Sequence, residues 1–405
     1  MNIRVLSWIA QGTVHVPPSK SMAHRLLICA GMCEGESVVR GISDCEDVQA
    51  TLDCLRAVGA ECTQCGDIVT VRGVDFRSAH PNRILNCRES GSTLRFLIPP
   101  LLLSGGSVTF EGQGRLMERP MTVYETLFRE RGLTMERVEN RLTVSGRLTA
   151  GKFVLAGNVS SQFVSGMLFA LPMADGDSTI ELIPPVESRS YILMTVDAMR
   201  QFGADVEWDG DHRLHIRGGW RYSPLSGYVE SDYSNAAFTD AFNCFGGNVK
   251  LEGLRADSLQ GDRCYKEAMQ KLCQGHATVS LKDCPDLGPS LFAVAAAKHG
   301  GVFTETARLR IKESDRVETM RQELEKFGVQ MTVEEDRVEI MMGELKAPKS
   351  PLLGHNDHRI VMALTVLLTL TGGELHGAEA VRKSYPAFFD DLRSLGLRIE
   401  EILPL

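Results

Sequence analysis

The stretch Val16-Pro17-Pro18-Ser19-Lys20-Ser21-Met22-Ala23-His24-Arg25 sets a pattern that the rest of the chain repeats. Its two prolines end the extended run before them and disfavour helix at the residue preceding each ring. We expect Ser21 to cap an apolar helix over 22–32. Lys20 then lies just outside the positive end of this helix, and Arg25 about one turn inside it. The stretch predicts either an anion-binding helix terminus or an ordinary capped helix with solvated basic residues.

Length and composition describe a soluble globular chain with more than one domain. The 405 residues exceed one ordinary core, and 43% hydrophobic residues with mixed charge are typical of soluble proteins. The first residues lack the basic start and apolar block of a signal peptide. The longest apolar run, Ile360 to Leu370, is too short to cross a bilayer. We therefore expect a cytoplasmic protein with no membrane partner.

Cysteine usage and net charge narrow the classes of function further. The eleven cysteines, an odd number scattered through the chain, are typical of a reducing compartment. The close pair Cys62-x-x-Cys65 has no second pair or neighbouring histidines and does not predict a metal site. A net charge of −8 argues against a general nucleic-acid surface, although a local basic pocket is compatible with it. We expect neither a metal nor a nucleic-acid partner.

The chain repeats one organisation six times, in units of roughly 50 to 75 residues. Each unit has a helix that is apolar nearly all round, a glycine break, a short strand and an amphipathic helix, and most end on alternating strands. The apolar helices are expected at 21–32, 91–103, 161–173, 234–245, 286–298 and 357–370. Left-handed glycines are expected after the amphipathic helices, at Gly59, Gly132, Gly203, Gly275, Gly328 and Gly396. The pattern predicts an α/β fold whose apolar helices are buried.

The turn-rich segment 218–227 divides three units from three, and the first strand, 3–9, could pair with either half.

Basic side chains gather at the starts of the expected helices. Serine, aspartate and asparagine are explained there by capping, but the helix dipole disfavours cations, which need a counter-anion or an acidic neighbour. The basic residues in question are Arg25, Arg95, Arg119, Lys312, Arg316, Arg359 and Lys383. They predict an anion-selective site within an acidic protein.

Seven motifs at the helix starts occur in an order and spacing that resembles the 5-enolpyruvylshikimate-3-phosphate synthases, a family of enolpyruvyl transferases. The motifs are Ser19-Lys20-Ser21-x-x-x-Arg25, Ser90-Gly91-Ser92-Thr93-x-Arg95, Glu118-Arg119-Pro120, Ser160-Ser161-Gln162-Phe163, Gln260-Gly261-Asp262, Lys312-Glu313-Ser314-Asp315-Arg316 and Asn356-Asp357-His358-Arg359. The resemblance covers nearly the whole chain. It implies two globular domains of three βαβαββ units each, at 16–228 and at 1–15 plus 229–405, that close around an interdomain active site.

The reaction that the resemblance implies moves the enolpyruvyl group of phosphoenolpyruvate to the 5-hydroxyl of shikimate 3-phosphate and releases phosphate, by addition and elimination. It belongs to the shikimate pathway to chorismate and aromatic amino acids. Both substrates are phosphorylated carboxylates, which suits a cleft of arginines, lysines and helix termini. We expect no cofactor and no metal, since basic side chains supply the positive charge, and we expect a monomer.

The family pattern also implies a role for each matched residue. Asp286 would deprotonate the 5-hydroxyl, Glu313 would protonate the methylene carbon, and Lys20 would assist in acid–base steps. Phosphoenolpyruvate would be bound by Lys20, Gly91, Arg119, Gln162, Arg316, Arg359 and Lys383. Shikimate 3-phosphate would be bound by Lys20, Ser21, Arg25, Ser160, Ser161, Gln162, Ser188, Tyr191, Asp286 and Lys312. Asp315 and His358 would have supporting roles. Asp286 and Asp357 could instead be only helix caps.

Three other functions remain to be weighed. The UDP-N-acetylglucosamine enolpyruvyl transferases share the fold, but they carry a cysteine shortly before their Arg-Pro, and the segment 113–117 has none. An RNA 3′-phosphate cyclase would need a nucleotide-accepting histidine and a basic face. A non-catalytic anion-binding homologue would have no reason to keep Lys20, Arg119, Asp286 and Glu313 together.

Overall fold

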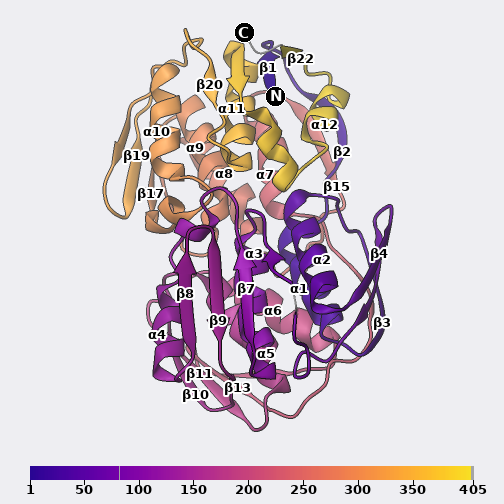
Figure 1. The fold of residues 1–405 in the computed structure, drawn as a ribbon. Coiled ribbons are helices and arrows are strands. Elements are labelled where there is room, and N and C mark those ends of the chain that lie inside the picture. Colours follow the sequence, from indigo (N-terminus) through magenta and orange to yellow (C-terminus); the bar gives the residue numbers. More distant parts are fainter. Residues whose placement is uncertain (82, 403–405) are drawn as a thin grey trace. The chain divides into compact units, whose positions relative to one another are not determined.

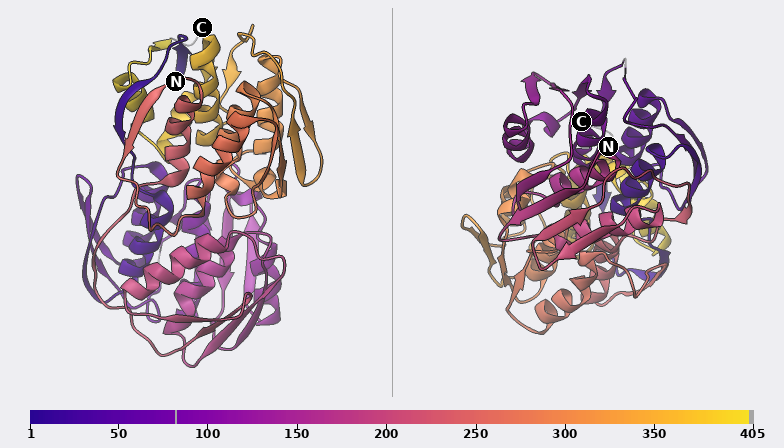
Figure 2. Two further views of the ribbon diagram at one scale, coloured as in Figure 1. Left: turned by 180° about the vertical axis from the view of Figure 1, so that it is seen from behind. Right: turned by 90° about the horizontal axis from the view of Figure 1, so that it is seen from below.

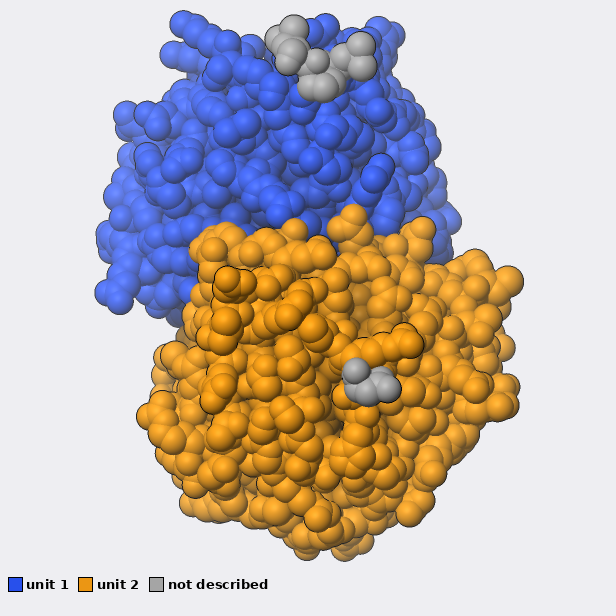
Figure 3. All heavy atoms as spheres, viewed as in Figure 1, with its two compact units in different colours: residues 1–17, 231–405 blue, residues 18–230 orange. Residues whose placement is uncertain are grey.

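The computed structural model describes residues 1–81 and 83–402. The chain divides into two compact units, which Figure 3 colours separately. Unit 1 is formed by Met1–Pro17 with Ser231–Leu405, and unit 2 by Pro18–Glu230. The domain boundaries expected from the sequence lie two residues before these.

Unit 2 contains three four-stranded sheets that share one strand order. An edge strand pairs parallel with a second strand, and a third and fourth strand continue the sheet antiparallel. The sheets are β14-β3-β5-β4, β6-β7-β9-β8 and β10-β11-β13-β12. Their strands are β3 (Gly35–Arg40), β4 (Glu61–Cys65), β5 (Ile68–Gly73), β6 (Leu85–Asn86), β7 (Ser107–Glu111), β8 (Thr134–Val138), β9 (Arg141–Ser145), β10 (Lys152–Ala156), β11 (Ser178–Ile183), β12 (Val206–Asp209), β13 (Arg213–Ile216) and β14 (Ser226–Tyr228). This recurrence is the structural form of the repeat seen in the sequence.

Unit 1 repeats the same sheet twice, as β16-β17-β19-β18 and β20-β21-β1-β22, and adds the parallel pair β15-β2. Its strands are β1 (Asn2–Val5), β2 (Gln11–His15), β15 (Asn248–Glu252), β16 (Ala277–Ser280), β17 (Gly301–Thr304), β18 (Met331–Val333), β19 (Arg337–Ile340), β20 (Leu352–Leu353), β21 (Gly373–His376) and β22 (Ile399–Ile402). The first strand therefore pairs with the last part of the chain, with Ile3 opposite Leu375 and Glu401. Burial of Ile3 and Val5 in the core of unit 1 explains this pairing, which the residue pattern alone left open.

Helices alternate along the chain between buried and half-buried. The buried helices are α1 (Lys20–Gly31), α3 (Gly91–Leu101), α5 (Ser161–Ala170), α7 (Tyr233–Cys244), α9 (Gly288–Ala297) and α11 (His358–Thr371). The half-buried helices are α2 (Glu46–Val58), α4 (Thr122–Glu130), α6 (Arg189–Gln201), α8 (Tyr265–Gln274), α10 (Arg316–Lys326) and α12 (Phe388–Ser394). Figures 1 and 2 show α7, α9 and α11 side by side in unit 1. The prediction that the helices with apolar residues all round are buried is confirmed.

Two local predictions were wrong. Helix α1 begins at Lys20, because Ser19 has extended backbone after Pro18 and its hydroxyl accepts from the backbone N–H of Met22 at 3.4 Å. Ser21 is thus inside the helix and does not cap it. Gly275 has φ 167° and ψ −176°, which is extended backbone and not the expected left-handed form.

No helix among residues 1–81 and 83–402 combines the length and the apolar character needed to cross a lipid bilayer.

Close packing of α3 against α5 explains one glycine in unit 2. Pro99 lies within α3 and has no N–H, so the carbonyl of Arg95 lacks its usual helical partner. The Tyr124 hydroxyl bonds to that carbonyl at 2.9 Å and lies 3.1 Å from the carbonyl of Phe163 in α5. A Cβ at Gly166 would lie 2.1 Å from this hydroxyl and 2.3 Å from the Arg95 carbonyl oxygen. Only glycine lets the two helices approach this closely.

We predict that Gly166→Ala lowers the free energy of unfolding by about 1–3 kcal/mol through overpacking. Urea unfolding followed by circular dichroism measures the change. Gly275→Ala is the matched control, because its Cβ would meet nothing within 4 Å and its backbone suits any residue. Equal unfolding midpoints for the two variants would contradict this account of the helix contact.

Candidate active site

The residues expected to form the site fall into two groups, one in each unit, and most of them lie at or just before helix starts. Unit 2 holds Lys20, Ser21, Arg25, Gly91, Arg119, Ser160, Ser161, Gln162, Ser188 and Tyr191. Unit 1 holds Asp286, Lys312, Glu313, Asp315, Arg316, His358, Arg359 and Lys383.

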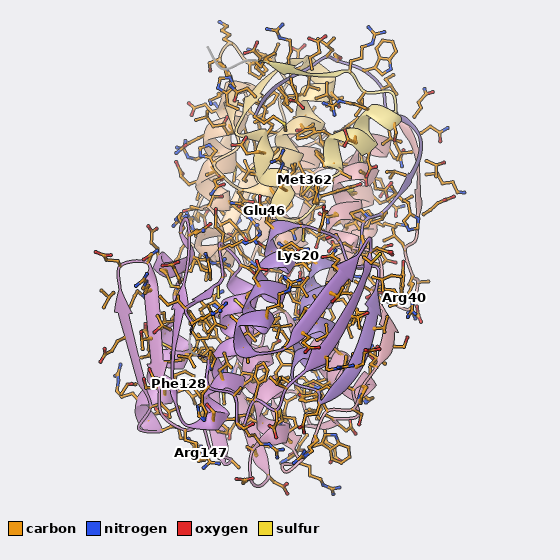
Figure 4. The ribbon with its side chains drawn as sticks, turned by 45° about the vertical axis from the view of Figure 1, so that its right-hand side comes forward. Lys20, Arg40, Glu46, Phe128, Arg147 and Met362 are labelled. Atoms are coloured by element: carbon orange, nitrogen blue, oxygen red, sulfur yellow. The ribbon has the colours of Figure 1, made fainter. Side chains whose placement is uncertain are left out.

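Lys20 is the first residue of α1, and its Nζ lies 2.7 Å from Oδ2 of Asp47 in the first turn of α2. Figure 4 shows Lys20 and Glu46 close together where α1 and α2 begin. A lysine at a helix start is disfavoured by the helix dipole, and the facing carboxylate compensates for this. The sequence shows that α2 has an acidic start, but not that Asp47 reaches Lys20.

Arg25 is the most deeply buried cation of α1, at 2% exposure. Its guanidinium donates to Thr195 Oγ1 at 2.8 Å and to the carbonyl oxygens of Ser21 and Tyr191 at 2.6 and 3.0 Å. It also lies over the rings of Phe96 and Tyr191. Burial lowers the pKa of Arg25 to about 10, so the side chain remains charged at neutral pH. These contacts are all to neutral groups, which leaves the positive charge without a carboxylate among the described residues.

A second chain of contacts joins the starts of α3 and α5. Arg95 Nη1 donates to Gln162 Oε1 at 2.6 Å, and Gln162 Nε2 donates to Ser92 Oγ at 2.9 Å. Ser160 caps α5 by accepting from the Gln162 N–H, and Ser161 is the first residue of the helix. The amide of Gln162 is therefore held in one orientation.

Gly91 starts α3 beside the buried guanidinium of Arg119. A Cβ at Gly91 would lie 2.8 Å from Arg119 Nη1. Gly91 therefore makes room for Arg119, whether or not a ligand also contacts the Gly91 backbone.

Ser188 and Tyr191 stand at the start of α6. Ser188 has φ 54°, a left-handed conformation that is uncommon for serine, and its side chain is buried. Tyr191 contributes its carbonyl and its ring to Arg25. The Tyr191 N–H donates to the Ser188 carbonyl at 3.1 Å, so Ser188 fixes the turn that carries Tyr191 to Arg25.

In unit 1 the carboxylate of Asp286 is surrounded by three basic side chains. Asp286 lies in a 3₁₀ turn, Pro285–Leu287, immediately before α9. Its Oδ1 lies 3.2 Å from Lys312 Nζ and 3.0 Å from Arg316 Nη1, and its Oδ2 lies 3.0 Å from Arg359 Nη2. Burial alone would raise the pKa of Asp286, but Arg359, Lys312 and Arg316 outweigh it and hold the pKa well below its usual value. Asp286 is therefore an ionised carboxylate and not a helix cap.

Arg316 is the centre of this cluster. The first residue of α10, it is 1% exposed and meets Asp286, Glu313 and Asp357 with its three guanidinium nitrogens. Glu313 Oε2 lies 2.7 Å from Nη2, and Asp357 Oδ2 lies 2.9 Å from Nε. Burial lowers the pKa of Arg316, but the three carboxylates outweigh burial and raise it.

Asp357 and Asp315 have structural roles that the sequence left open. Asp357 caps α11 by accepting from the Arg359 N–H at 2.9 Å, and it also holds Arg316 and the hydroxyl of Ser314. Asp315 caps α10 and lies 3.6 Å from Arg310 Nη1.

The turn before α11 places the remaining residues. His355 and Asn356 have left-handed backbone, with φ 48° and 53°. Glu323 holds this turn from α10, through His355 Nε2 at 2.9 Å and the Leu353 N–H at 3.0 Å. Lys383 Nζ donates to the Asn356 carbonyl at 2.6 Å. His358 is the first residue of α11. Its side chain is 1% exposed, and its Nδ1 lies 3.9 Å from Asp357 Oδ1.

Asp262 is a further member of the unit 1 cluster whose importance the sequence did not reveal. It is buried beside α7 and accepts a hydrogen bond from the Ser234 hydroxyl. Burial, and after it the negative charge of Asp286, raise the pKa of Asp262 to about 6. Its motif was visible in the sequence, but its closeness to Asp286 depends on tertiary structure.

Among residues 1–81 and 83–402 no group of three or more histidine, cysteine, aspartate or glutamate side chains is arranged to hold a metal ion.

We predict that Asp262 makes the protein less stable as the pH rises from about 4 to about 6. Its folded-state pKa lies about two units above the usual value, so the folded form binds the proton more tightly, a difference of about 3 kcal/mol. Asp262→Asn should therefore gain about 2–3 kcal/mol of unfolding free energy relative to the unsubstituted protein between pH 4 and pH 7. Urea unfolding at both pH values measures this. Exposed Asp257→Asn should show no gain, and a pH-independent difference for Asp262→Asn would contradict the prediction.

The family model described as EPSP synthase (3-phosphoshikimate 1-carboxyvinyltransferase) matches residues 9–392. A relative from Clostridium kluyveri named 3-phosphoshikimate 1-carboxyvinyltransferase is 37% identical, over 96% of this chain and 96% of the relative. A relative of the same name from Clostridium beijerinckii is 36% identical, over 98% of this chain and 97% of the relative.

Solved structures show the same fold. An EPSP synthase structure from Acinetobacter baumannii has a TM-score of 0.78 at 24% identity and covers 99% of this chain and 100% of its own. This likeness confirms the α/β, enolpyruvyl transferase-like fold class expected from the sequence. With the family model and the Clostridium relatives, it identifies this chain as a member of the EPSP synthase (3-phosphoshikimate 1-carboxyvinyltransferase) family.

Proposed function

We propose that this protein transfers the enolpyruvyl group of phosphoenolpyruvate to the 5-hydroxyl of shikimate 3-phosphate, releasing phosphate, in the pathway to aromatic amino acids. The family match over residues 9–392 supports this assignment. The structural observation that carries it is the ionised carboxylate of Asp286, held by Lys312, Arg316 and Arg359. A fixed anion among several cations is what proton removal from an alcohol beside anionic substrates requires.

Asp286 is proposed to accept the proton of the 5-hydroxyl. Its three basic neighbours keep it ionised and therefore free of a proton before the substrate binds. They also make it a weak base while they all face it. When anionic substrates share Lys312 and Arg359, less positive charge will act on Asp286, and its affinity for a proton will rise.

Glu313 and Lys20 are proposed to complete the acid–base steps. Glu313 would deliver the proton to the methylene carbon, while its contact with Arg316 at 2.7 Å fixes its position. Lys20 would assist at the bridging oxygen of phosphoenolpyruvate. General acids and bases of this kind typically contribute ~10²- to 10⁴-fold each.

The anionic groups of the substrates are proposed to bind the basic side chains of both units. Shikimate 3-phosphate would contact Lys20, Ser21, Arg25, Ser160, Ser161, Gln162, Ser188, Tyr191, Asp286 and Lys312. Phosphoenolpyruvate would contact Lys20, Gly91, Arg119, Gln162, Arg316, Arg359 and Lys383. Arg25 supports this best, because among residues 1–81 and 83–402 its buried charge has hydrogen bonds to neutral groups alone. Three further points stay predictions. The site residues of unit 1 and unit 2 act on the same pair of substrates, the reaction needs no metal, and the chain acts as a cytoplasmic monomer.

The direct test is phosphate release from phosphoenolpyruvate, measured with shikimate 3-phosphate and, in parallel, with UDP-N-acetylglucosamine. Release with shikimate 3-phosphate alone is the expected result. Release only with the nucleotide sugar would assign the chain to the other enolpyruvyl transferases. Release with neither acceptor would support a non-catalytic homologue.

Asp286→Asn should lower kcat by about 10²- to 10⁴-fold, because an amide cannot accept the hydroxyl proton. The KM values should change far less than kcat, since asparagine keeps the shape of aspartate. Initial rates of phosphate release at varied concentrations of each substrate measure both. The matched control, exposed Asp283→Asn, should keep its kcat. A variant at position 286 with unchanged kcat would remove Asp286 from the proposed chemistry.

Arg25→Gln should raise the KM for shikimate 3-phosphate by about 10- to 100-fold, as expected for losing one charge-assisted bond worth about 1.5–3 kcal/mol. The KM for phosphoenolpyruvate should change much less. The control is Arg56→Gln, which removes an exposed arginine paired with Asp53 on α2. Equal effects on both KM values, with a normal unfolding temperature, would show that Arg25 does not select shikimate 3-phosphate.

A further inference from the structure

The turn that precedes α11 contains backbone that is uncommon for its residues. His355 has φ 48° and Asn356 has φ 53°, both in the left-handed region. Among residues 1–81 and 83–402 they are the only two consecutive residues other than glycine with positive φ. Such backbone costs free energy, persists only where the surrounding structure holds it, and is concentrated at functional sites. The contacts that hold this turn therefore indicate its role.

The carboxylate of Glu323 in α10 holds the turn with both of its oxygens. Glu323 is 1% exposed, and its Oε2 accepts a hydrogen bond from the Leu353 N–H at 3.0 Å. Its Oε1 lies 2.9 Å from Nε2 of His355. The Nζ of Lys326, 2.9 Å from Oε2, also donates to the carbonyl oxygen of Pro351 at 3.2 Å. The segment before α11 is thus fixed to α10 at three points.

The Glu323 carboxylate is ionised despite its burial. Burial raises the pKa of Glu323, but hydrogen bonds from His355, Lys326 and the Leu353 N–H outweigh it and hold the pKa below its usual value. A buried charge is costly unless its acceptors are used, as they are here. Among residues 1–81 and 83–402 these three partners are its only hydrogen-bond donors, and none of them is expected to bind substrate. The burial of Glu323 is therefore explained by the turn that it holds.

This turn leads directly into the unit 1 site. The Asn356 carbonyl accepts a hydrogen bond from Lys383 Nζ at 2.6 Å. Asp357, next along the chain, caps α11 by accepting from the Arg359 N–H at 2.9 Å. Arg359 Nη2 in turn lies 3.0 Å from Asp286 Oδ2. A change of backbone conformation in the turn would move the Asn356 carbonyl and the first residues of α11, and with them both basic side chains.

We propose that Glu323 is a positioning residue for phosphoenolpyruvate: it holds the turn before α11 in its left-handed conformation and thereby places Arg359 and Lys383. The effect on substrate binding rests on the proposed function, whereas the anchoring of the turn does not. Loss of the anchor should weaken the binding of phosphoenolpyruvate more than that of shikimate 3-phosphate, because most contacts expected for shikimate 3-phosphate lie in unit 2.

The first measurement is backbone hydrogen exchange in the full-length protein and in Glu323→Gln, followed by mass spectrometry of peptic peptides that cover 351–357. Glutamine keeps the shape of glutamate but has an amide that donates in place of one acceptor oxygen, so at least one of the three donors loses its acceptor. We expect exchange in this segment to become about 10- to 100-fold faster, as for the loss of one hydrogen bond to a charged group. The matched control, Glu325→Gln, changes an exposed glutamate of α10 and should leave the exchange unchanged.

The second measurement is phosphate release at varied concentrations of each substrate. Glu323→Gln should raise the KM for phosphoenolpyruvate about tenfold, while kcat and the KM for shikimate 3-phosphate change by less than about threefold. His355→Asn is the second variant, because asparagine suits left-handed backbone but its shorter side chain cannot meet Glu323. It should raise the same KM by a smaller factor, since the contacts of Glu323 with Leu353 and Lys326 remain. It supplies the result if Glu323→Gln does not fold.

Unchanged exchange at 351–357 in Glu323→Gln overturns the proposal. A KM for phosphoenolpyruvate equal to that of the control overturns it, as does an equal rise in both KM values, since a role limited to overall stability would not separate the two substrates. Urea unfolding of each variant, followed by circular dichroism, shows that the kinetic changes belong to folded protein. If the unsubstituted protein releases no phosphate at all, the proposed function fails, while the exchange measurement still tests whether Glu323 holds the turn.

Discussion

The guanidinium of Arg316, buried against Asp286, Glu313 and Asp357, is the interaction on which the unit 1 site depends. A cation at 1% exposure loses its hydration, and it is stable there only if nearby carboxylates compensate for that loss. The three carboxylates come from the turn before α9, the segment before α10 and the start of α11. Balancing one buried charge therefore brings three distant parts of the sequence to one place and fixes the ionised Asp286 there.

Unit 2 balances its buried cations differently. Lys20 has a carboxylate partner in Asp47, whereas Arg25 is held by a hydroxyl, two backbone carbonyls and two aromatic rings. Neutral acceptors fix the position of a guanidinium without cancelling its charge. Arg25 therefore keeps an attraction for an anion that a salt bridge would have satisfied. This contrast connects the geometry with the phosphorylated carboxylates that the family uses as substrates.

Much of the fold was predictable because it depends on local pattern. The buried helices have apolar residues on every side, and the motif residues mark where they begin. Prediction failed where the difference was a matter of one or two residues, as with Ser19 and Ser21, which both suit a helix cap. It also failed wherever tertiary contact decides: nothing local shows that Asp47 faces Lys20 or that Asp262 adjoins Asp286.

Contact of the Arg316 guanidinium with Asp286, Glu313 and Asp357 organises the carboxylates proposed to react, and the kinetics of Arg316→Lys tests this most directly. Lysine keeps the positive charge but cannot meet three carboxylates with separate nitrogens. Losing one or two charge-assisted bonds predicts a fall in kcat/KM of about 100-fold or more, with the fold retained. Phosphate release close to that of the unsubstituted protein would show that charge alone suffices and that the geometry around Arg316 does not organise the site.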